Sequence, residues 1–528
     1  MGIHWGRWTN TPVFVNLLDV KNDQKCQKDQ KPLLLLYTKM SVVHITAGQT
    51  LTPEYLETAW EELLDDPQYK ASRNAVARND VLTVVENRDV TQNFNHVYSN
   101  VVSKEGKCTT QKSSGRCWMF AMCNVMRVAM MKQYNLPDDF ELSQGYLFYY
   151  DKLERGNFFL EGIIETIDEP ASSRIVTHLC SDPLCDGGQW DMLVNIVQKY
   201  GVCPKAAFPE TKCCVASRRM NQFLKNKLRQ YACQIRAEHS SPTKTTVEDL
   251  RATKLVMMTE YHKILSTFFG QPPTTFNWSF RDSKKNYHTY CNVTPKTFYE
   301  QHVPFDVDGY VSLIHDPRNP YYKHYTVEHL GNVVGGFPIR YINVPIDVLR
   351  ALTITSIDHD EPVWFGCDVG KSMQREKGIL HEDMYDFEST FGTSFGMNKE
   401  ERLVYGESLM THAMVFTAYD RVQVSDVDAK STSKNAKVLG GNGEGEDEEE
   451  KEETTVAEDQ KVVKWRVENS WGTDKGDKGY LGMSDGWYKE WVYQIACNKK
   501  YLDDSLLKIL NQRPTKLPAW DPMGALAK

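Results

Sequence analysis

The stretch that decides the fold is Gln111-Lys-Ser-Ser-Gly-Arg-Cys-Trp118, which is followed by an apolar run of helical character, residues 119–126. A cysteine in the first turn of a helix meets free backbone N–H groups and the positive end of the helix dipole, and both favour the thiolate. The side-chain amide of Gln111 can return to the same place. With the backbone N–H of Cys117 it would form an oxyanion hole with two donors. The stretch therefore predicts a nucleophile and the groups that stabilise the charge its attack creates.

The residues around Cys117 match part of the papain-type signature C-G-[SA]-C-[WY]. Gly115, Cys117 and Trp118 fit the signature, whereas Ser114 replaces a cysteine that forms a disulfide in secreted papain-like proteases, and Arg116 replaces a small residue. The chain has thirteen cysteines, an odd number without zinc-like spacing. We therefore expect free thiols, no metal site and a cytoplasmic protein.

Length and composition limit the function classes. With 528 residues and 41% apolar content, the chain can form two or three structural units. The net charge of −8 argues against bulk attraction to nucleic acid, although an acidic run at 444–453 supplies much of that charge. The apolar run 33–36 is too short for a signal peptide or a membrane span, so no membrane association is expected.

The pattern of the chain changes near residue 362. Helical periodicity dominates before it, with a helix from about Ser143 and charged helical stretches at 218–236 and 247–269, whereas short β-type runs separated by turns follow it. The basic residues of the first charged stretch are better explained as a solvated helix face than as a nucleic-acid site. A helical half and a β half leave a cleft between them, which is a common place for an active site.

A cysteine nucleophile needs a base, and the base needs a residue that orients it. His412 falls where an apolar strand begins, and Asn469 lies in Asn-Ser-Trp-Gly at the end of a later strand. Asn469 can fix the imidazole tautomer, and Trp471 can shield that hydrogen bond from water. On its own, His412 would be better explained as a structural histidine. The chain order is that of papain, but the gap from Cys117 to His412 is about twice the usual 130–150 residues.

Six motifs together carry a resemblance to a known family. They are Gln111–Trp118, Asp186–Asn195, Trp364–Gly370, Gly406–Met414, Trp465–Gly472 and Leu517–Ala527. In this order they resemble the bleomycin hydrolase family, the cytosolic branch of the papain-like cysteine peptidases. That family accepts Ser-Gly-Arg before the cysteine and has a large helical insertion, which explains both departures from the signature and the long gap.

The resemblance implies an α+β, papain-like fold with a helical half, an antiparallel β-barrel half, a large helical insertion and a C-terminal arm in the cleft. It implies that Cys117 is the nucleophile, His412 the base and acid, Asn469 its orienting residue and Gln111 the side-chain donor of the oxyanion hole. The remaining expected substrate-binding residues are Gly187, Gly188, Trp471 and Lys528. The glycines suit that role because the substrate backbone must approach closely.

The expected organisation follows from these motifs. Residues 1–39 are either a lineage-specific extension or untranslated, with Met40 as the true start. The expected segments are 40–214 for the helical half, 215–360 for the mainly helical insertion, 361–516 for the β half with a disordered acidic loop at 425–460, and 517–528 for the arm. In the family the arm blocks the non-primed side of the cleft, and Lys528 either occupies the site or is trimmed off.

The expected function is that of a broad-specificity cysteine aminopeptidase that acts on peptides with a free N-terminus and on related amides through a thioester. No cofactor is needed, and the family implies a homohexamer. Two alternatives remain at this point. One is a nucleic-acid-binding or scaffold protein on an inactive peptidase fold, although all four catalytic positions hold competent residues. The other is an endopeptidase whose arm is displaced from the cleft.

Overall fold

The computed structural model describes residues 51–241, 245–423 and 460–527. The predictions for residues 1–39 and Met40, for nearly all of the acidic loop 425–460, and for Lys528 therefore lie outside the described residues. The chain divides into two compact units, residues 1–70 and 71–528.

In the first unit, helix α1 spans Pro53–Asp65. The hydroxyl of Thr52 accepts a hydrogen bond from the backbone N–H of Tyr55 at 3.2 Å, which caps the helix. Helix α2, Pro67–Val76, starts in this unit and ends in the second one.

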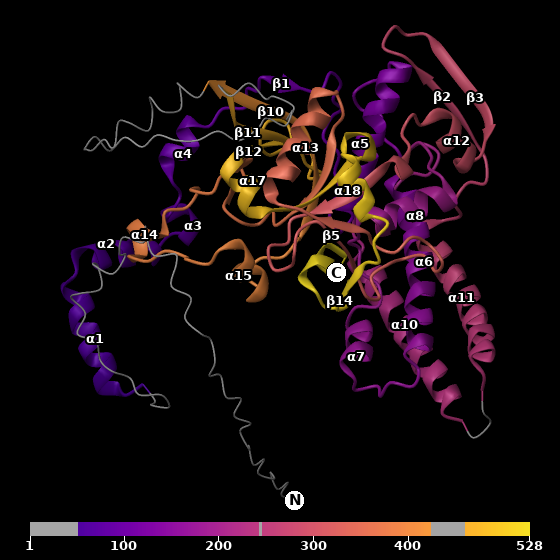
Figure 1. The fold of residues 1–528 in the computed structure, drawn as a ribbon, viewed down its shortest axis with the longest axis horizontal. Helices are drawn as coiled ribbons and strands as arrows, with labels where there is room; N and C mark the ends of the chain where they lie inside the picture. Colours follow the sequence, from indigo (N-terminus) through magenta and orange to yellow (C-terminus); the bar gives the residue numbers. More distant parts are fainter. Residues whose placement is uncertain (1–50, 242–244, 424–459, 528) are drawn as a thin grey trace, which may run out of the picture. The chain divides into compact units, whose positions relative to one another are not determined.

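The helices of the second unit gather mainly in the N-terminal half of the chain, as expected (Figure 1). Within the described ranges, none is long and apolar enough to cross a membrane. The helices are α3 Val81–Val84, α4 Arg88–Asn93, α5 Cys117–Tyr134, α6 Gln144–Glu165, α7 Arg174–Ser181, α8 Trp190–Tyr200, α9 Lys212–Val215, α10 Arg218–His239, α11 Val247–Phe269, α12 Pro295–His302, α13 Ile346–Asp358, α14 Phe387–Phe391, α15 Lys399–Val404, α17 Asp485–Trp491 and α18 Asp504–Ile509, with 3₁₀ turns η2 Val307–Gly309, η3 Lys499–Tyr501 and η4 Pro522–Ala527.

One sheet of mixed direction dominates the C-terminal half, and its order is β14-β5-β6-β4-β13-β7-β10-β11-β12-β9-β8, with β1 paired to β10. A separate hairpin joins β2 to β3. The strands are β1 Asn100–Val101, β2 Phe276–Arg281, β3 Tyr287–Val293, β4 Tyr310–Ile314, β5 Lys323–Val327, β6 Tyr341–Asn343, β7 Val363–Cys367, β8 Met373–Gln374, β9 Ile379–Leu380, β10 His412–Gln423, β11 Gln460–Glu468, β12 Tyr480–Ser484, β13 Val492–Asn498 and β14 Thr515–Leu517.

The central strands β7, β10 and β11 pair antiparallel, and they lie in the part of the chain after residue 362 where the sequence predicts short strands. The segment 215–360 contains α10 and α11 where the sequence predicts helices, but it also supplies β4, β5 and β6 to the main sheet. These strands have only three to five residues each. Such short runs carry too little periodicity to be recognised beside long helices.

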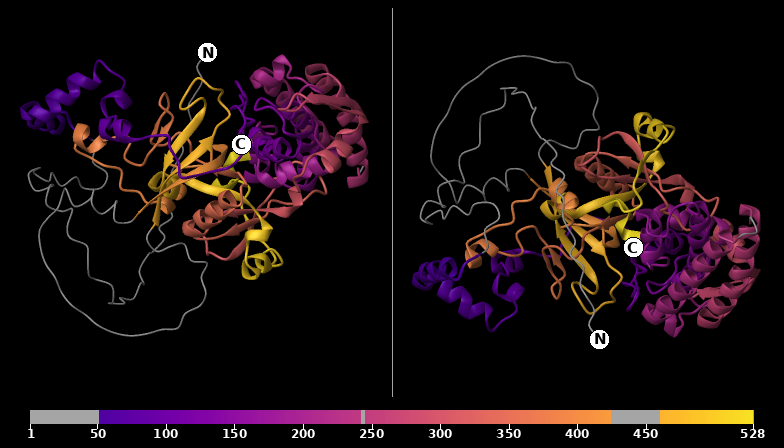
Figure 2. Two further views of the ribbon diagram at one scale, coloured as in Figure 1. Left: turned by 90° about the horizontal axis from the view of Figure 1, so that it is seen from above. Right: turned by 90° about the horizontal axis from the view of Figure 1, so that it is seen from below.

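Helix α5 lies between the two halves. It is buried along most of its length and packs on β10 and β7 of the sheet. Figure 2 shows the purple and magenta helices on one side of the orange and yellow strands, with the C-terminal turn η4 where the two meet. The N-terminal end of α5, and therefore Cys117, lies against the start of β10.

A buried ion pair joins the two halves through α5. The guanidinium of Arg127 lies 2.5 Å from Oε1 of Glu468 in β11, and both side chains are about 1% exposed. Arg127 also donates to the carbonyl oxygen of Lys107 at 2.8 Å. Since Glu468 directly precedes Asn469, this pair also fixes the end of the strand that carries the predicted orienting residue.

We expect Arg127→Ala to lower the free energy of unfolding by about 3–5 kcal/mol, because it leaves the Glu468 carboxylate buried without a partner. Denaturant titration of the purified chain measures this change. The matched control is Lys107→Ala, which removes an ion pair to Asp138 whose side chains are both 59% exposed. Its expected effect is below about 1 kcal/mol. Equal effects of the two substitutions would contradict the role given to Arg127.

Candidate active site

Cys117 is the first residue of α5, so the helix begins at the predicted nucleophile. The next residue fixes the start of the helix, because the indole N–H of Trp118 donates to the carbonyl oxygen of Asp186 at 2.7 Å. In turn, the carbonyl oxygen of Trp118 accepts from the indole of Trp364 in β7 at 3.1 Å. The thiol is therefore carried by a helix end that both halves of the fold hold in place.

Gln111 ties the loop before α5 to the loop after β11. Its backbone N–H donates to the carbonyl oxygen of Ser470 at 2.8 Å, and its Oε1 accepts from the Ser470 hydroxyl at 2.7 Å. Neither of these bonds uses the amide nitrogen Nε2 of Gln111. One N–H of this nitrogen donates to the carbonyl oxygen of Ser114 at 2.5 Å. A side-chain amide has two N–H donors. The second can serve an oxyanion.

His412 is the first residue of β10, and Nε2 of its ring lies 2.8 Å from Oδ1 of Asn469. The oxygen Oδ1 can only accept, so Nε2 carries the proton and Nδ1 is left for another partner. The indole ring of Trp471 lies beside the imidazole, with ring centroids 5.0 Å apart. Trp471 thus covers the bond from His412 to Asn469, as the sequence suggests.

A cavity of about 250 Å³ brings the predicted residues together. Gln111, Cys117, Gly187 and His412 all line it. Asn469 and Trp471 both contact the His412 ring, which lines the cavity. Gly188 packs against the Trp118 ring, where an added β-carbon would collide with the indole. Leu526 of the C-terminal arm lines the same cavity, so the arm reaches the nucleophile as expected.

Burial controls the protonation of both reacting groups. It raises the pKa of the Cys117 thiol to about 11, and nearby backbone groups of Ala413, Trp118 and Cys117 lower it only in part. Burial also lowers the pKa of His412 to about 4, against the effect of its bond to Asn469. The helix start favours the thiolate as predicted, but in this closed state desolvation outweighs it. Both shifts favour a neutral thiol and a neutral imidazole.

Asp186 is the main residue of the site to which sequence reasoning gave no role, although it belongs to a quoted motif. Its carboxylate accepts from Lys152 at 2.7 Å, from Asn221 at 2.6 Å and from the backbone N–H of Gly115 at 3.2 Å. Burial alone would raise its pKa, but Lys152 and its hydrogen bonds hold the pKa well below its usual range. Asp186 thus joins the nucleophile loop to α6 and α10 as a fixed anion.

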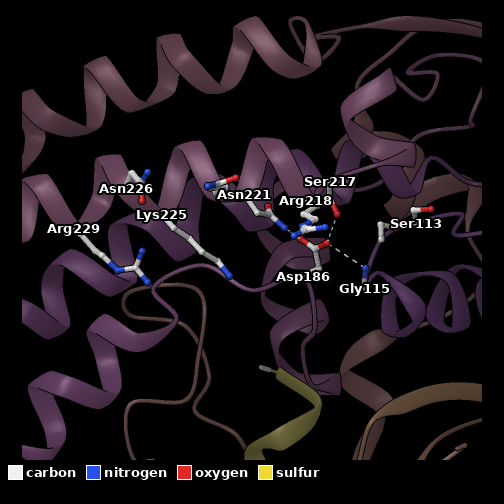
Figure 3. Close-up of a pocket in the computed structure, with 11 residues that line it drawn as sticks. Ser113, Gly115, Asp186, Ser217, Arg218, Asn221, Lys225, Asn226 and Arg229 are labelled. Atoms are coloured by element: carbon white, nitrogen blue, oxygen red, sulfur yellow. Dashed lines mark hydrogen bonds between the residues drawn. The ribbon is translucent and has the colours of Figure 1, made fainter.

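A second cavity, of about 540 Å³, lies beside the first one, and Figure 3 draws the residues that line it. The two share Gly115, Asp186, Asn221 and Lys225 in their linings. Figure 3 shows that α10 forms one wall, with Lys225 and Arg229 along it and Asp186 at one end. The cavity beside the Cys117 thiol therefore adjoins a larger cavity that is lined mainly by polar side chains.

The structure explains why Ser114 and Arg116 differ from the papain-type signature. Arg116 is fully buried and makes two bonds of 2.7 Å to the carboxylate of Glu210. Its Nε also donates to the Ser114 hydroxyl at 2.9 Å, and that hydroxyl donates to the carbonyl oxygen of Gln111 at 2.7 Å. In this chain a buried ion pair and a hydroxyl hold the nucleophile loop. Every cysteine in the described residues is free.

The C-terminal arm is held at several points before it reaches the cavity. Strand β14 pairs with β5, and the Trp520 ring lies 3.7 Å under the Arg174 guanidinium. Asp521 pairs with Arg318 at 2.9 Å. The carbonyl oxygen of Met523 accepts from the Tyr341 hydroxyl at 3.2 Å. The arm is therefore a packed part of the fold.

Among the described residues, the group of side chains close enough to share a metal ion is His381, Glu382 and Asp383, whose ligand atoms lie within 4.8 Å of one another. None of the three lines the cavity at Cys117. The groups that line this cavity include the Cys117 thiol, the His412 imidazole and the Gln111 amide.

Known proteins are similar to this chain over about 90% of its length. The profile of the peptidase C1-like family matches residues 50–452 and 419–524. The chain is 45% identical to the bleomycin hydrolase of Gallus gallus and 44% identical to that of Homo sapiens, covering 90% of this chain and 99% of each relative. The crystal structure of PepW from Lactobacillus rhamnosis HN001 superposes with a TM-score of 0.81 at 40% identity, over 90% of this chain and 99% of that one.

We expect removal of Leu526–Lys528 to move the pH profile of Cys117 alkylation to lower pH. Shortening the arm exposes the thiol, and burial is the main cause of its raised pKa. Iodoacetamide reacts with the thiolate, so the midpoint of the rate against pH reports the thiol pKa independently of access. The full chain should show a midpoint near pH 11, with a shift of about one pH unit or more on shortening. Identical midpoints would refute this effect of the arm.

Proposed function

Because this chain belongs to the peptidase C1-like family and is a cysteine aminopeptidase of the bleomycin hydrolase type, we propose that it removes N-terminal residues from peptides through a thioester on Cys117. Related amides with a free amino group would react in the same way. The proposal rests on one observation above all: the C-terminal arm ends in the cavity that holds Cys117 and His412.

The reaction follows from the positions of the side chains. Nδ1 of His412 accepts the thiol proton of Cys117, which gives a thiolate–imidazolium pair. The thiolate sulfur attacks the first peptide carbonyl carbon, and the carbonyl π electrons move to the oxygen, which becomes the oxyanion of a tetrahedral intermediate. The oxyanion receives hydrogen bonds from the Cys117 backbone N–H and from Nε2 of Gln111. His412 then protonates the leaving amine as the C–N bond breaks, which leaves a thioester. Asn469 keeps the ring oriented throughout.

Hydrolysis of the thioester uses the same groups. His412, neutral again, takes a proton from water as the oxygen attacks the thioester carbonyl. The C–S bond breaks, the thiol is reprotonated, and the released amino acid departs. The neutral state favoured by burial suits this step, because an imidazole must be unprotonated to act as a base.

The arm explains the preference for a free N-terminus. Leu526 stands beside Gly187, where an extended substrate chain would otherwise continue. Little room remains ahead of the first residue, and the negative end of the chain would attract an α-ammonium group. The polar cavity in Figure 3 leaves space for first side chains of different sizes, which supports broad specificity.

We place this enzyme in the cytoplasm as a homohexamer, on the family resemblance and on the free cysteines of the described residues. Light scattering on the purified chain would test the assembly. A nucleic-acid role has weaker support, because three of the basic side chains of α10 are engaged within the fold. Lys225 pairs with Asp182 and Lys227 with Glu260, each at 2.7 Å, and Arg229 donates to two carbonyl groups.

Wild-type chain should hydrolyse aminoacyl-aminomethylcoumarins with a free amino group and leave the N-acetylated substrates intact. Cys117→Ala should abolish turnover. Asn469→Ala should lower kcat by about 10²-fold, because the imidazole loses its orientation. A chain without Leu526–Lys528 should gain activity on N-acetylated substrates. Strong cleavage of blocked substrates by the full chain would favour an endopeptidase instead.

Lys528 should be absent from the active purified enzyme, because Leu526, two positions earlier in the chain, lines the cavity that holds Cys117. Intact-mass measurement would show a loss of one lysine in the wild type and a full-length mass in Cys117→Ala. The same full-length mass in both would argue against trimming.

A further inference from the structure

The proposed mechanism does not use Cys185, yet this cysteine lies at the end of the C-terminal arm. Its thiol donates a hydrogen bond to the carbonyl oxygen of Ala527, with Sγ and O 2.6 Å apart. Cys185 is buried, with 7% of its surface exposed. Ala527 is the last residue that the structure describes, so this bond is the contact closest to the chain end.

The thiol of Cys185 is itself oriented by Arg155 of α6. One nitrogen of the guanidinium donates to Sγ of Cys185 at 3.1 Å, and another donates to the carbonyl oxygen of Gly187 at 2.8 Å. Asp151 holds the guanidinium with two bonds of 3.0 and 3.2 Å. A thiol has a single hydrogen. Two carbonyl oxygens can accept it, that of Ala527 at 2.6 Å from Sγ and that of Gly187 at 3.6 Å, and the much closer oxygen of Ala527 is its main acceptor.

The protonated form of Cys185 is the one this geometry requires. Burial raises the pKa of its thiol, although Arg155 and Lys152 lower it. A thiolate would face the carbonyl oxygen of Ala527 without a hydrogen between them, which is repulsive. The neutral thiol is therefore a donor to the arm.

The Leu526 peptide group of the arm, next to Ala527, packs against Gly187. A β-carbon added at Gly187 would collide with the carbonyl oxygen of Leu526. The carbonyl of Leu526 thus lies against Gly187, and the carbonyl of Ala527 lies on Cys185. These two contacts fix where the arm ends relative to Cys117, since Leu526, Gly187 and Cys117 line one cavity.

We propose that Cys185, oriented by Arg155, is a positioning residue that sets the register of the C-terminal arm and thereby limits the substrate to one residue ahead of the cleaved bond. This inference rests on the aminopeptidase function proposed above and names a residue that enforces it. One residue of extended chain spans about 3.3 Å. A displacement of the arm by that distance would admit a second residue or a blocking group.

The test compares Cys185→Ala with Cys185→Ser, which keeps a hydroxyl donor, and with Cys180→Ala as the matched control. Cys180 is a half-buried cysteine in α7. Its backbone carbonyl oxygen accepts a hydrogen bond from Arg229. A hydrogen bond contributes about 0.5–1.5 kcal/mol, or about a two- to tenfold change in binding. For Cys185→Ala we expect KM for free aminoacyl-aminomethylcoumarins to rise by about that factor, with kcat changed less than about twofold.

The second readout is selectivity. Cleavage of N-acetylated substrates and release of dipeptides should increase in Cys185→Ala, return toward wild type in Cys185→Ser, and stay unchanged in Cys180→Ala. Amide hydrogen exchange of residues 515–527 should accelerate near the chain end in the alanine variant alone. In a chain that ends at Leu526, the effect of Cys185→Ala should vanish, because its partner is gone.

Cys185→Val serves as a second variant without a donor if the alanine variant does not fold. The proposal is overturned if folded variants without the donor match wild type in KM, in selectivity and in exchange of the arm. Should the wild type show no alkylator-sensitive hydrolysis at all, the proposed function fails instead. The exchange measurement would still show whether Cys185 holds the arm.

Discussion

The two hydrogen bonds between Gln111 and Ser470 are the contact on which the rest of the site depends. Through them the loop that leads into α5 is held against the loop that leaves β11. The first loop ends at Cys117, and the second begins at Asn469. Since Asn469 in turn orients His412, these bonds bring the nucleophile, the oxyanion donor and the base into one arrangement. Neither half of the fold contains the site alone.

Closing the site has an electrostatic consequence. The same packing that positions Cys117 and His412 removes water from them, and burial moves their pKa values apart in the direction that keeps both neutral. Proton transfer to the imidazole is then coupled to attack on the substrate. Asp186 adds a smaller effect in the same direction on the pKa of Cys117, while Lys152, Asn221 and Gly115 bind its carboxylate. The anion serves to connect elements of the fold.

The sequence predicts those parts of the site whose signals are local. A cysteine before an apolar helical run, a histidine where a strand begins and an asparagine at a strand end can each be recognised within a few residues. The bond from Cys185 to Ala527 cannot, because 342 positions separate the two residues and neither belongs to a repeating pattern. Asp186 stands in a recognised motif, but its role depends on Lys152 and Asn221, which only the tertiary fold brings near. The short strands β4 to β6 were missed for lack of periodicity.

Different residues of the C-terminal arm hold it in the cleft and set the position of its tip. Its anchors lie upstream, where β14 pairs with β5, Trp520 lies under Arg174 and Asp521 meets Arg318. These contacts keep the arm in the cleft whatever happens at its tip. The last two described residues are buried, with Leu526 3% and Ala527 6% exposed, and both belong to the hydrophobic core. The carbonyl of Leu526 also lies against Gly187, and that of Ala527 accepts from the Cys185 thiol. A change in these contacts at the tip leaves the upstream anchors in place. Specificity for the N-terminus can therefore change while the fold stays intact.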